Sequence, residues 1–206
     1  MTSQTATPTD AELVARVVGG DRAAFGVLYA RHAPLVGRRL LRILGTRPEA
    51  EDVLQQTFLE VHRSLPRYSP QRPFAAWLHG IALNLSIRAL RARSRRAWFR
   101  LGETGHSADA PDPMSAELPA DERLVRGELM VALQAAMSRL SAKKRVAFAL
   151  HEIDGMGFTE IAEVLGETTQ TVWARVDSAR KAIQKDLGTR PRANATPPPG
   201  SAKEVS

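Results

Sequence analysis

A row of side chains suited to holding a nucleic-acid strand lies in the middle of the sequence. Five residues recur at spacings of seven, four, three and four positions, which places them on one stripe of an α-helix. They are Trp77, Asn84, Arg88, Arg91 and Arg95. Guanidinium groups bind phosphates, an indole ring stacks on an exposed base, and an amide hydrogen-bonds to a base edge. The stripe therefore indicates a surface for nucleic acid, and for an unpaired strand in particular.

The charge around this stripe is segregated along the chain. The 206-residue sequence has a formal net charge of +7. Residues 61–102 contain nine arginines and no acid, whereas residues 103–122 contain six acids and no lysine or arginine. The basic segment supplies phosphate affinity that weakens steeply as salt rises. The acidic segment is polar and contains prolines, which predicts a flexible linker.

The sequence offers little that catalyses a reaction. It contains no cysteine, which excludes disulfides, thiolate metal sites and thiol catalysis. Glu49, Glu51 and Asp52 are able to hold Mg²⁺ in principle, but Glu51 and Asp52 are neighbours that diverge on a helix. The five histidines lack the spacing of metal ligands, and no glycine-rich phosphate loop is present. We therefore expect no enzyme, no metal and no cofactor.

No segment predicts secretion or insertion into a membrane. The longest apolar runs fall well short of a membrane span, and the first ten residues have neither the charged nor the apolar segment of a signal peptide. The absence of cysteine fits a reducing cytosol. We expect a cytoplasmic protein without direct membrane insertion.

Start and stop signals for helices recur through the first part of the chain. Thr9 and Glu12 form a capping-box pattern before a short helix. Asp21 caps a second helix, which Gly45 ends. Pro34 lies inside this second pattern, so we expect a kink or a restart there.

Two more helices are predicted before residue 100. Thr46 and Glu49 make another capping-box pattern, and the helix that they open closes at Pro66. Residues 68–73 read YSPQRP, which predicts a loop because of its prolines. A long helix follows at about 74–96. Strand-like alternation appears nowhere, so the predicted fold class is all-α.

The remaining patterns predict a second helical domain. Helical periodicity resumes near Leu124 and runs to Leu140, and Ser141 then caps a helix that ends near Asp154. The chain is thus predicted to be two helical domains joined by a flexible acidic linker. The first domain is predicted at residues 1–100 and the linker at 101–123. The second domain is predicted at 124–188 and a disordered tail at 189–206.

Residues 158–185 have the pattern of a helix-turn-helix motif. Thr159 is expected to cap a short helix, Gly166 to end it in a left-handed conformation, and Thr168 to cap a longer helix. Ala162 is small where the two helices cross. The second helix is expected to enter the major groove of DNA. A plain helical hairpin is the alternative, which the agreement of these positions disfavours.

Nine positions on the second helix are candidates for contact with duplex DNA. An arginine there reaches a phosphate or a guanine, and Asp177 either accepts from cytosine or pairs with Lys181. The candidates are Gln170, Thr171, Trp173, Ala174, Arg175, Asp177, Ser178, Arg180 and Lys181.

Together these motifs resemble bacterial RNA polymerase sigma factors of the extracytoplasmic-function (ECF) type. The segments GDRAAFGVLYARH, AEDVLQQTFLEVHRSL and YSPQRPFAAWLHGIALN are similar to sigma region 2. The segment LSAKKRVAFALHEIDGMGFTEIAEVLGETTQTVWARVDSARKAI is similar to region 4. The linker is too short for the extra helical domain of larger sigma factors. The resemblance implies a promoter-specificity subunit without catalysis of its own.

The resemblance also implies how promoter DNA is bound. The first domain would capture the minus-10 element as it melts, with the arginines from Arg88 to Arg96 on the backbone, and the helix-turn-helix would read the minus-35 element. The residues implied for minus-10 DNA are Tyr68, Arg72, Phe74, Trp77, Asn84, Arg88, Arg91 and Arg95.

Protein partners are implied as well. An acidic helix would dock on the clamp helices of the largest polymerase subunit, although the same acids also suit the helix dipole. The residues implied for core polymerase are Glu49, Glu51, Asp52, Gln55, Thr57 and Phe58. Further implied partners are the polymerase flap and an anti-sigma factor. The acidic linker would mimic nascent RNA in the polymerase cleft or act as a solvated spacer.

Three positions depart from the family pattern. Arg88 stands where aspartate is common, Gln56 where glutamate is common, and Trp173 where a basic residue is common. Arg88 affects the expected packing behind the minus-10 pocket. Trp173 affects which minus-35 sequence is expected to be read. A stand-alone helix-turn-helix regulator is the alternative function, but it leaves the arginine–aromatic segment unexplained.

Overall fold

The computed structural model describes residues 7–100 and 120–188, which form eight α-helices and no β-strand. The all-α prediction is confirmed for these residues. The first domain consists of α1 (Asp10–Val18), α2 (Arg22–Leu44), α3 (Arg47–Ser64), a 3-10 turn η1 (Leu65–Arg67) and α4 (Phe74–Arg100). The second consists of α5 (Ala120–Ser138), α6 (Ala142–Phe148), a π-helical turn η2 (Ala149–Ile153), α7 (Phe158–Leu165) and α8 (Thr169–Asp186).

Several helix boundaries follow directly from local sequence signals. Thr9 and Glu12 form both hydrogen bonds of the predicted capping box. The carboxylate of Asp21 caps α2, and the hydroxyl of Thr168 caps α8. Gly45 ends α2 in the left-handed conformation with φ of 86°.

Three predicted caps are not formed. The Thr46 hydroxyl donates to the carboxylate of Glu49 at 3.1 Å instead of accepting from the backbone. Ser141 occupies the cap position of α6 but makes no capping hydrogen bond with its side chain. Gly157 precedes α7, so Thr159 is the second residue of the helix and the prediction that it caps was wrong.

Helix lengths also differ from the predictions. α2 continues through Pro34 without a restart, and α4 extends to Arg100. α5 begins at Ala120, so the last residues of the predicted linker are helical. The rest of that linker and the predicted tail fall in 101–119 and 189–206, outside the described residues.

Buried aliphatic side chains hold each domain together. Full burial of such a side chain contributes about 1.5–3 kcal/mol. Residues at 0% exposure in the first domain include Leu28, Ile43, Val61, Leu78 and Leu83. In the second domain they include Met137, Leu150, Ile161 and Val172. These cores fix the orientation of α4 and α8, which carry the candidate DNA-binding residues.

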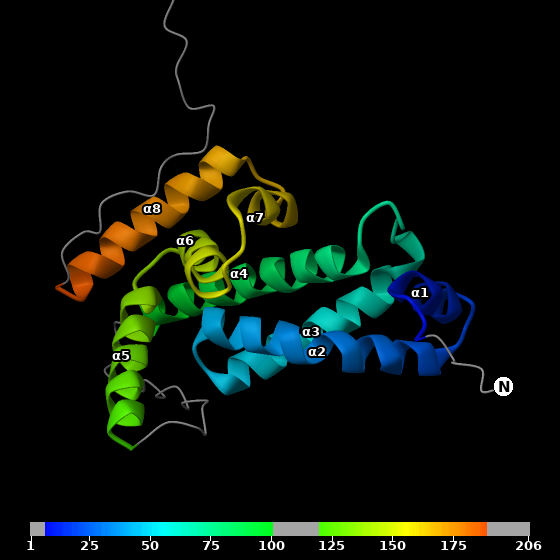
Figure 1. Ribbon diagram of the computed structural model, residues 1–206, viewed down its shortest axis with the longest axis horizontal. Coiled ribbons are helices and arrows are strands. Elements are labelled where there is room, and N and C mark those ends of the chain that lie inside the picture. Colours follow the sequence, from blue (N-terminus) through cyan, green and yellow to red (C-terminus); the bar gives the residue numbers. More distant parts are fainter. Residues whose placement is uncertain (1–6, 101–119, 189–206) are drawn as a thin grey trace, which may run out of the picture.

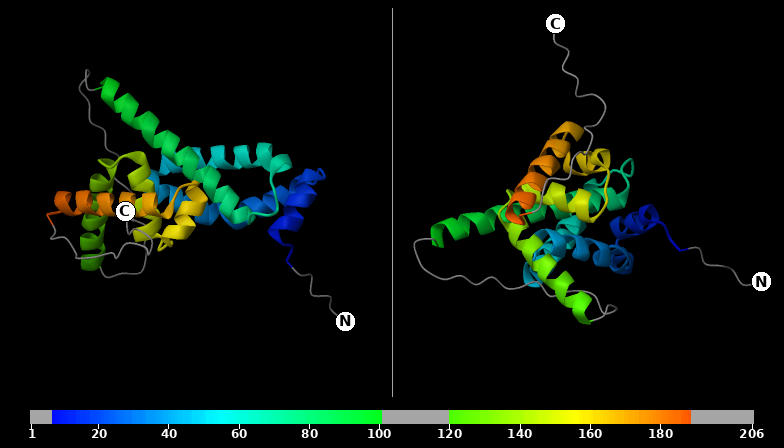
Figure 2. Two further views of the ribbon diagram at one scale, coloured as in Figure 1. Left: turned by 90° about the horizontal axis from the view of Figure 1, so that it is seen from above. Right: turned by 60° about the vertical axis from the view of Figure 1, so that its left-hand side comes forward.

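The two domains pack directly against each other, which no sequence pattern predicted. α4 contacts both α6 and α7, and α2 contacts η2. In Figure 1, α4 lies between α2 and α3 on one side and α6 and α7 on the other. Both views of Figure 2 show the C-terminal end of α4 projecting beyond the two domains.

Candidate nucleic-acid interface

Three aromatic rings cluster where the loop of residues 68–73 enters α4. The ring centroid of Tyr68 lies 5.0 Å from that of Trp77 and 5.9 Å from that of Phe74. Phe74 is only 2% exposed, so it supports the other two rings and is not available to a base in this conformation. Tyr68 and Trp77 are half-buried and border the surface. Burial, and then the charge of Asp10, raises the pKa of Tyr68, so its phenol is neutral.

Beyond this cluster, the predicted stripe lies on the surface of α4. Asn84, Arg88, Arg91 and Arg95 are all exposed. α4 contains no acid, and no carboxylate among the side chains that the structure describes pairs with these three arginines. Their guanidinium groups are therefore free to bind phosphates.

Arg93 is on the same helix but serves the fold. Its guanidinium donates to the Glu49 carboxylate at 2.7 Å and to the Leu44 carbonyl at 3.1 Å. It ties α4 to the end of α2 and the start of α3. Arg93 therefore does not belong to the row of free arginines, contrary to the expectation for Arg88 to Arg96. Glu49, predicted to contact polymerase, is engaged within the domain.

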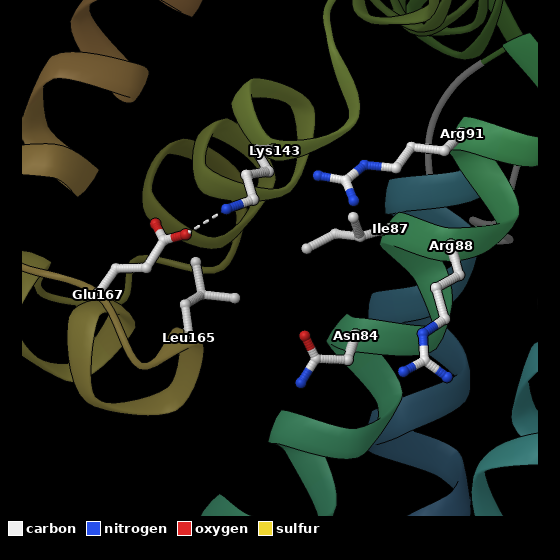
Figure 3. A pocket seen from close by; sticks show the side chains of 7 residues that line it. All are labelled: Asn84, Ile87, Arg88, Arg91, Lys143, Leu165 and Glu167. Carbon is white, nitrogen blue, oxygen red and sulfur yellow. Dashed lines mark hydrogen bonds and ion pairs between the residues drawn. The ribbon is translucent and has the colours of Figure 1, made fainter.

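The middle of the stripe borders a pocket of about 270 Å³ between the two domains (Figure 3). In Figure 3, the side chains of Asn84 and Arg91 point toward the second domain. Opposite them, the ammonium group of Lys143 donates to the Glu167 carboxylate at 2.8 Å. The lining residues are Asn84, Ile87, Arg88 and Arg91 from α4, and Lys143, Leu165 and Glu167 from the second domain.

The residues predicted for core polymerase divide into two groups on α3. Glu51, Asp52 and Gln55 are exposed. Thr57 and Phe58 are 0% and 4% exposed, and the Thr57 hydroxyl donates to a carbonyl of the preceding turn at 2.7 Å. These two side chains belong to the core and face no partner in this conformation.

A groove beside the exposed acids was not predicted. α2 and α3 enclose a cavity of about 200 Å³, lined by Gly37, Arg38, Leu41, Arg47, Ala50, Glu51 and Leu54. A Cβ added to Gly37 would lie 3.5 Å from the Leu54 side chain, which is an ordinary van der Waals contact. A second missed residue is Leu59, which is 57% exposed and lies four positions after Gln55 on α3.

The helix-turn-helix geometry is present as predicted. Gly166 ends α7 with φ of 65°, and the Thr168 hydroxyl accepts from the backbone nitrogen of Thr171 at 3.2 Å. Ile161 and Val172 are fully buried at the joint between α7 and α8. This arrangement leaves one face of α8 to carry the DNA-reading candidates.

Both arginines of that face are paired with acids of the second domain. Arg175 is paired with Glu167, and Arg180 with Glu152. Burial lowers the pKa of Arg175. If α8 were to contact DNA through these arginines, each would have to exchange its carboxylate partner for a phosphate or a base.

The other α8 candidates differ in exposure. Asp177 pairs with Lys181 at 2.8 Å, so the simpler of its two predicted roles is the one observed. The indole Nε1 of Trp173 is buried and has no hydrogen-bond partner among the described residues. Gln170 and Ala174 are exposed, whereas Thr171, Trp173 and Ser178 are half-buried.

Two other kinds of site, for a metal ion and for a membrane span, are absent from residues 7–100 and 120–188. No cluster of histidine or carboxylate side chains there is arranged to hold a metal ion. None of the helices in those ranges is long and apolar enough to cross a membrane. The features that require explanation are therefore the basic, aromatic and acidic surfaces.

Each of the two domains contains a segment that matches a known protein family. Residues 28–96 match Sigma-70 region 2, and residues 130–183 match Sigma-70 region 4. The chain is 34% identical over 171 residues to the ECF RNA polymerase sigma factor SigE of Mycolicibacterium smegmatis, covering 82% of this chain and 64% of SigE. It is 31% identical over 180 residues to the ECF sigma factor SigM of Mycobacterium tuberculosis, covering 87% of this chain and 85% of SigM.

Solved structures share the fold. The sigma factor RpoE in complex with the anti-sigma factor NepR from Bartonella quintana aligns with a TM-score of 0.60 at 21% identity, covering 81% of this chain and 98% of RpoE. CnrH in complex with the cytosolic domain of CnrY aligns with a TM-score of 0.55 at 26% identity, covering 85% and 95%. Sigma factors initiate transcription and are not catalysts. The two matched regions and these relatives show that the chain belongs to the ECF subfamily of RNA polymerase sigma factors.

Proposed function

We propose that this sigma factor uses α4 to read and hold the melted minus-10 strand of a promoter. The observation that carries the proposal is the row of Asn84, Arg88, Arg91 and Arg95, exposed and without acidic partners among the described residues, behind an aromatic cluster. An unstacked base finds an aromatic surface and an amide, and the guanidinium groups neutralise the phosphates. A duplex offers no such exposed bases, so the strand binds once the promoter opens.

A second surface, on α8, reads the minus-35 element in duplex DNA. The N-terminal half of a recognition helix lies closest to the base edges, which places Gln170, Thr171 and Ala174 there. Arg175 and Arg180 leave their acidic partners for phosphate or guanine. The half-buried Trp173 supports this face.

A third surface binds core polymerase. Glu51, Asp52 and Gln55 form an exposed polar face on α3, and the groove between α2 and α3 lies beside it. This combination of charge and apolar area suits a partner helix, such as the clamp helices of the largest subunit. The second domain meets the polymerase flap.

We also propose that an anti-sigma factor binds and regulates this chain. RpoE, which shares this fold, was solved in complex with the anti-sigma factor NepR, and CnrH was solved in complex with the cytosolic domain of CnrY. The chain acts with RNA polymerase in the cytoplasm, where the inhibitor withholds it until needed.

Replacing Asn84 with alanine tests the base-reading role. Transcription from the cognate promoter falls roughly ten-fold, as expected for losing 1–3 kcal/mol of base contact. Affinity for core polymerase, measured by fluorescence anisotropy, stays at the level of the parent chain. Loss of core affinity in Asn84→Ala contradicts the role, because Asn84 belongs to α4, whereas the residues proposed for core binding belong to α3.

The role of Arg175 is tested with two promoters, one intact and one with a scrambled minus-35 element. Scrambling lowers transcription strongly with the parent chain and much less with Arg175→Ala, because the variant has already lost that contact. An equal loss in both chains shows that Arg175 does not read the element.

A further inference from the structure

The N-terminal helix lies close to the aromatic cluster of Tyr68, Phe74 and Trp77. α1 contacts η1, which leads into the loop of residues 68–73, and Figure 1 shows α1 at that end of the first domain. The imidazole of His32, on α2, packs on Phe74 with ring centroids 5.3 Å apart. Phe74 therefore connects this imidazole to the two rings that border the surface.

A carboxylate of α1 fixes the orientation of that imidazole. Oδ2 of Asp10 lies 2.9 Å from Nε2 of His32. A carboxylate only accepts hydrogen bonds, so this ring nitrogen donates. The torsion that turns an imidazole about its Cβ–Cγ bond has a broad energy profile, so packing alone defines the ring plane poorly. The hydrogen bond to Asp10 defines it, and with it the surface against which Phe74 packs.

Asp10 is itself held in place. Nη1 of Arg31 donates to its Oδ1 at 2.5 Å, and Nη2 of the same guanidinium donates to the Pro8 carbonyl at 2.8 Å. Each oxygen of the Asp10 carboxylate thus has its own partner on α2. The side chains of Asp10 and His32 are 25% and 11% exposed. In such a partly buried position a hydrogen bond to a charged group is stronger than in open water, so the contact resists rotation.

Tyr68, on the surface side of the cluster, also depends on this carboxylate. The Tyr68 hydroxyl donates to the Arg72 carbonyl at 2.5 Å and so closes the loop of residues 68–73. Burial, and then the charge of Asp10, raises the pKa of this phenol, which places Asp10 within electrostatic reach of it. A neutral phenol keeps its hydrogen for the Arg72 carbonyl. The orientation of Tyr68 is therefore coupled to Asp10 both through Phe74 and through the field of the carboxylate.

We propose that Asp10 is a positioning residue, which acts through His32 to orient the aromatic cluster that receives the unstacked base. This role rests on the proposed reading of the melted strand by the same cluster. Asp10 itself does not touch the strand. A stacking surface contributes fully only when its rings are held within about 0.5 Å of the productive geometry. Looser rings therefore lower the preference among bases, while the arginines of α4 still hold the phosphates.

A role in helix stability is the simpler explanation for an acid at this position. Asp10 and Glu12 both lie in the first turn of α1, where carboxylates favour the helix dipole. Glu12 in addition completes the capping box with Thr9. Glu12→Ala therefore weakens α1 at least as much as Asp10→Ala does, but it leaves the hydrogen bond between Asp10 and His32 in place. It is the matched control.

Fluorine NMR measures the orientation of the cluster. The chain has two tyrosines, Tyr29 and Tyr68, so fluorotyrosine gives two signals, which Tyr29→Phe assigns. Asp10→Ala is expected to shift the Tyr68 signal, because the ring loses its support, and to leave the Tyr29 signal in place. Glu12→Ala should leave both signals as in the parent chain. A Tyr68 signal that stays in place in Asp10→Ala, or that moves equally in Glu12→Ala, overturns the proposal.

Base preference is measured with the variant chains bound to core polymerase. The affinities for single-stranded oligo(dA), oligo(dC) and oligo(dT) give a ratio between the best-bound and the worst-bound strand. Asp10→Ala is expected to lower this ratio about three-fold or more. The slope of log affinity against log salt should not change, because the arginines of α4 are untouched. Glu12→Ala should keep the ratio of the parent. An unchanged ratio in Asp10→Ala, or a smaller salt slope, contradicts the positioning role.

His32→Phe tests the route from Asp10 to the cluster. Phenylalanine keeps an aromatic ring against Phe74 but forms no hydrogen bond with Asp10. This variant should lower the base preference as Asp10→Ala does, and adding Asp10→Ala to it should change nothing further. An additional loss in the double variant shows that Asp10 acts by another route and overturns the proposal.

Trp77→Ala separates this proposal from the proposed function. If Trp77→Ala keeps the base preference of the parent, the cluster does not read bases and the proposed function fails. A shifted Tyr68 signal in Asp10→Ala would still show that Asp10 orients the cluster. If Trp77→Ala loses the preference and Asp10→Ala keeps it, the cluster reads the strand and only the positioning role is wrong.

Discussion

Arg91 and Arg93 are two residues apart on α4, yet the structure gives them different roles. Arg91 is exposed beside the interdomain pocket, and Arg93 is bonded to Glu49 and Leu44. A separation of two positions turns a helical side chain by about 200°, which explains the difference. The same substitution at each position therefore distinguishes contact with DNA from support of the fold.

Arg91→Gln is predicted to reduce the salt dependence of single-strand binding. Each lost phosphate contact changes the slope of log affinity against log salt by about 0.7. Arg93→Gln should leave that slope unchanged and instead lower the free energy of unfolding. Titrations at several salt concentrations measure the slope, and equal slopes for the parent and Arg91→Gln contradict a phosphate contact.

The exposure of single residues was predicted correctly where their spacing along a helix determines which face they share. The stripe from Asn84 to Arg95 is exposed because its residues share one helical face. Thr57, Phe58 and Phe74 were expected at partner surfaces and are buried. An aromatic or threonine side chain in an amphipathic pattern suits a core as well as an interface, and only tertiary packing decides between them.

At the scale of elements, helix ends were predictable where one local interaction settles them. Thr9 and Thr168 cap their helices as expected. Thr46 fails because Glu49, its partner in the capping box, is held by Arg93, which is 44 residues further along the chain. The ion pair with Arg93 thus changes the hydrogen bonding of Thr46 and Glu49. The sequence around residues 46–49 does not indicate that this ion pair forms.

Gly166 carries the turn of the helix-turn-helix, and its replacement is predicted to destabilise the second domain. Gly166→Ala forces φ of 65° on alanine, at a cost of about 1–2 kcal/mol. No atom lies within 4 Å of the added Cβ, so this cost is conformational. Urea unfolding measures it.

The control is Gly26→Ala, inside α2 and equally uncrowded. It should stabilise the chain by about 0.5–1 kcal/mol, because alanine favours helix. An increase in stability for Gly166→Ala contradicts the assigned turn.

At the scale of the whole molecule, two helical domains were predictable from periodicity and composition, whereas their docking was not. Asp154 and Arg39 are 115 residues apart, and neither belongs to a motif that indicates the other. The charge of one residue in the sequence does not indicate which distant residue it will contact in the folded chain. The docked arrangement follows from the complementarity of complete surfaces, which becomes visible only after both domains have folded.

His79 lies at the junction between the domains, and we expect it to make the free energy of unfolding depend on pH. Arg39 donates to Nδ1 of His79 at 3.1 Å, so that nitrogen is unprotonated. Burial, and then the charge of Arg39, lowers the pKa of His79 from 6.5 to about 4. The unfolded chain therefore takes up this proton at higher pH than the folded chain does. Stability falls as pH drops from 6.5 toward 4, by on the order of 3 kcal/mol for this group.

His79→Gln should remove this part of the pH dependence. Urea unfolding at pH 7 and pH 4.5 compares the variant with the parent, and His62→Gln, at an exposed position, is the control. The same pH dependence in His79→Gln and the parent contradicts the neutral, buried imidazole.

The most direct test of the central claim is transcription by purified core polymerase on a library of genomic fragments, with and without the chain. We predict that specific transcripts appear only when the chain is added, and that they are strongly reduced with Asn84→Ala although that variant still binds core. Tight, sequence-specific binding of promoter duplex by the free chain, with no new transcripts upon adding core, would contradict it.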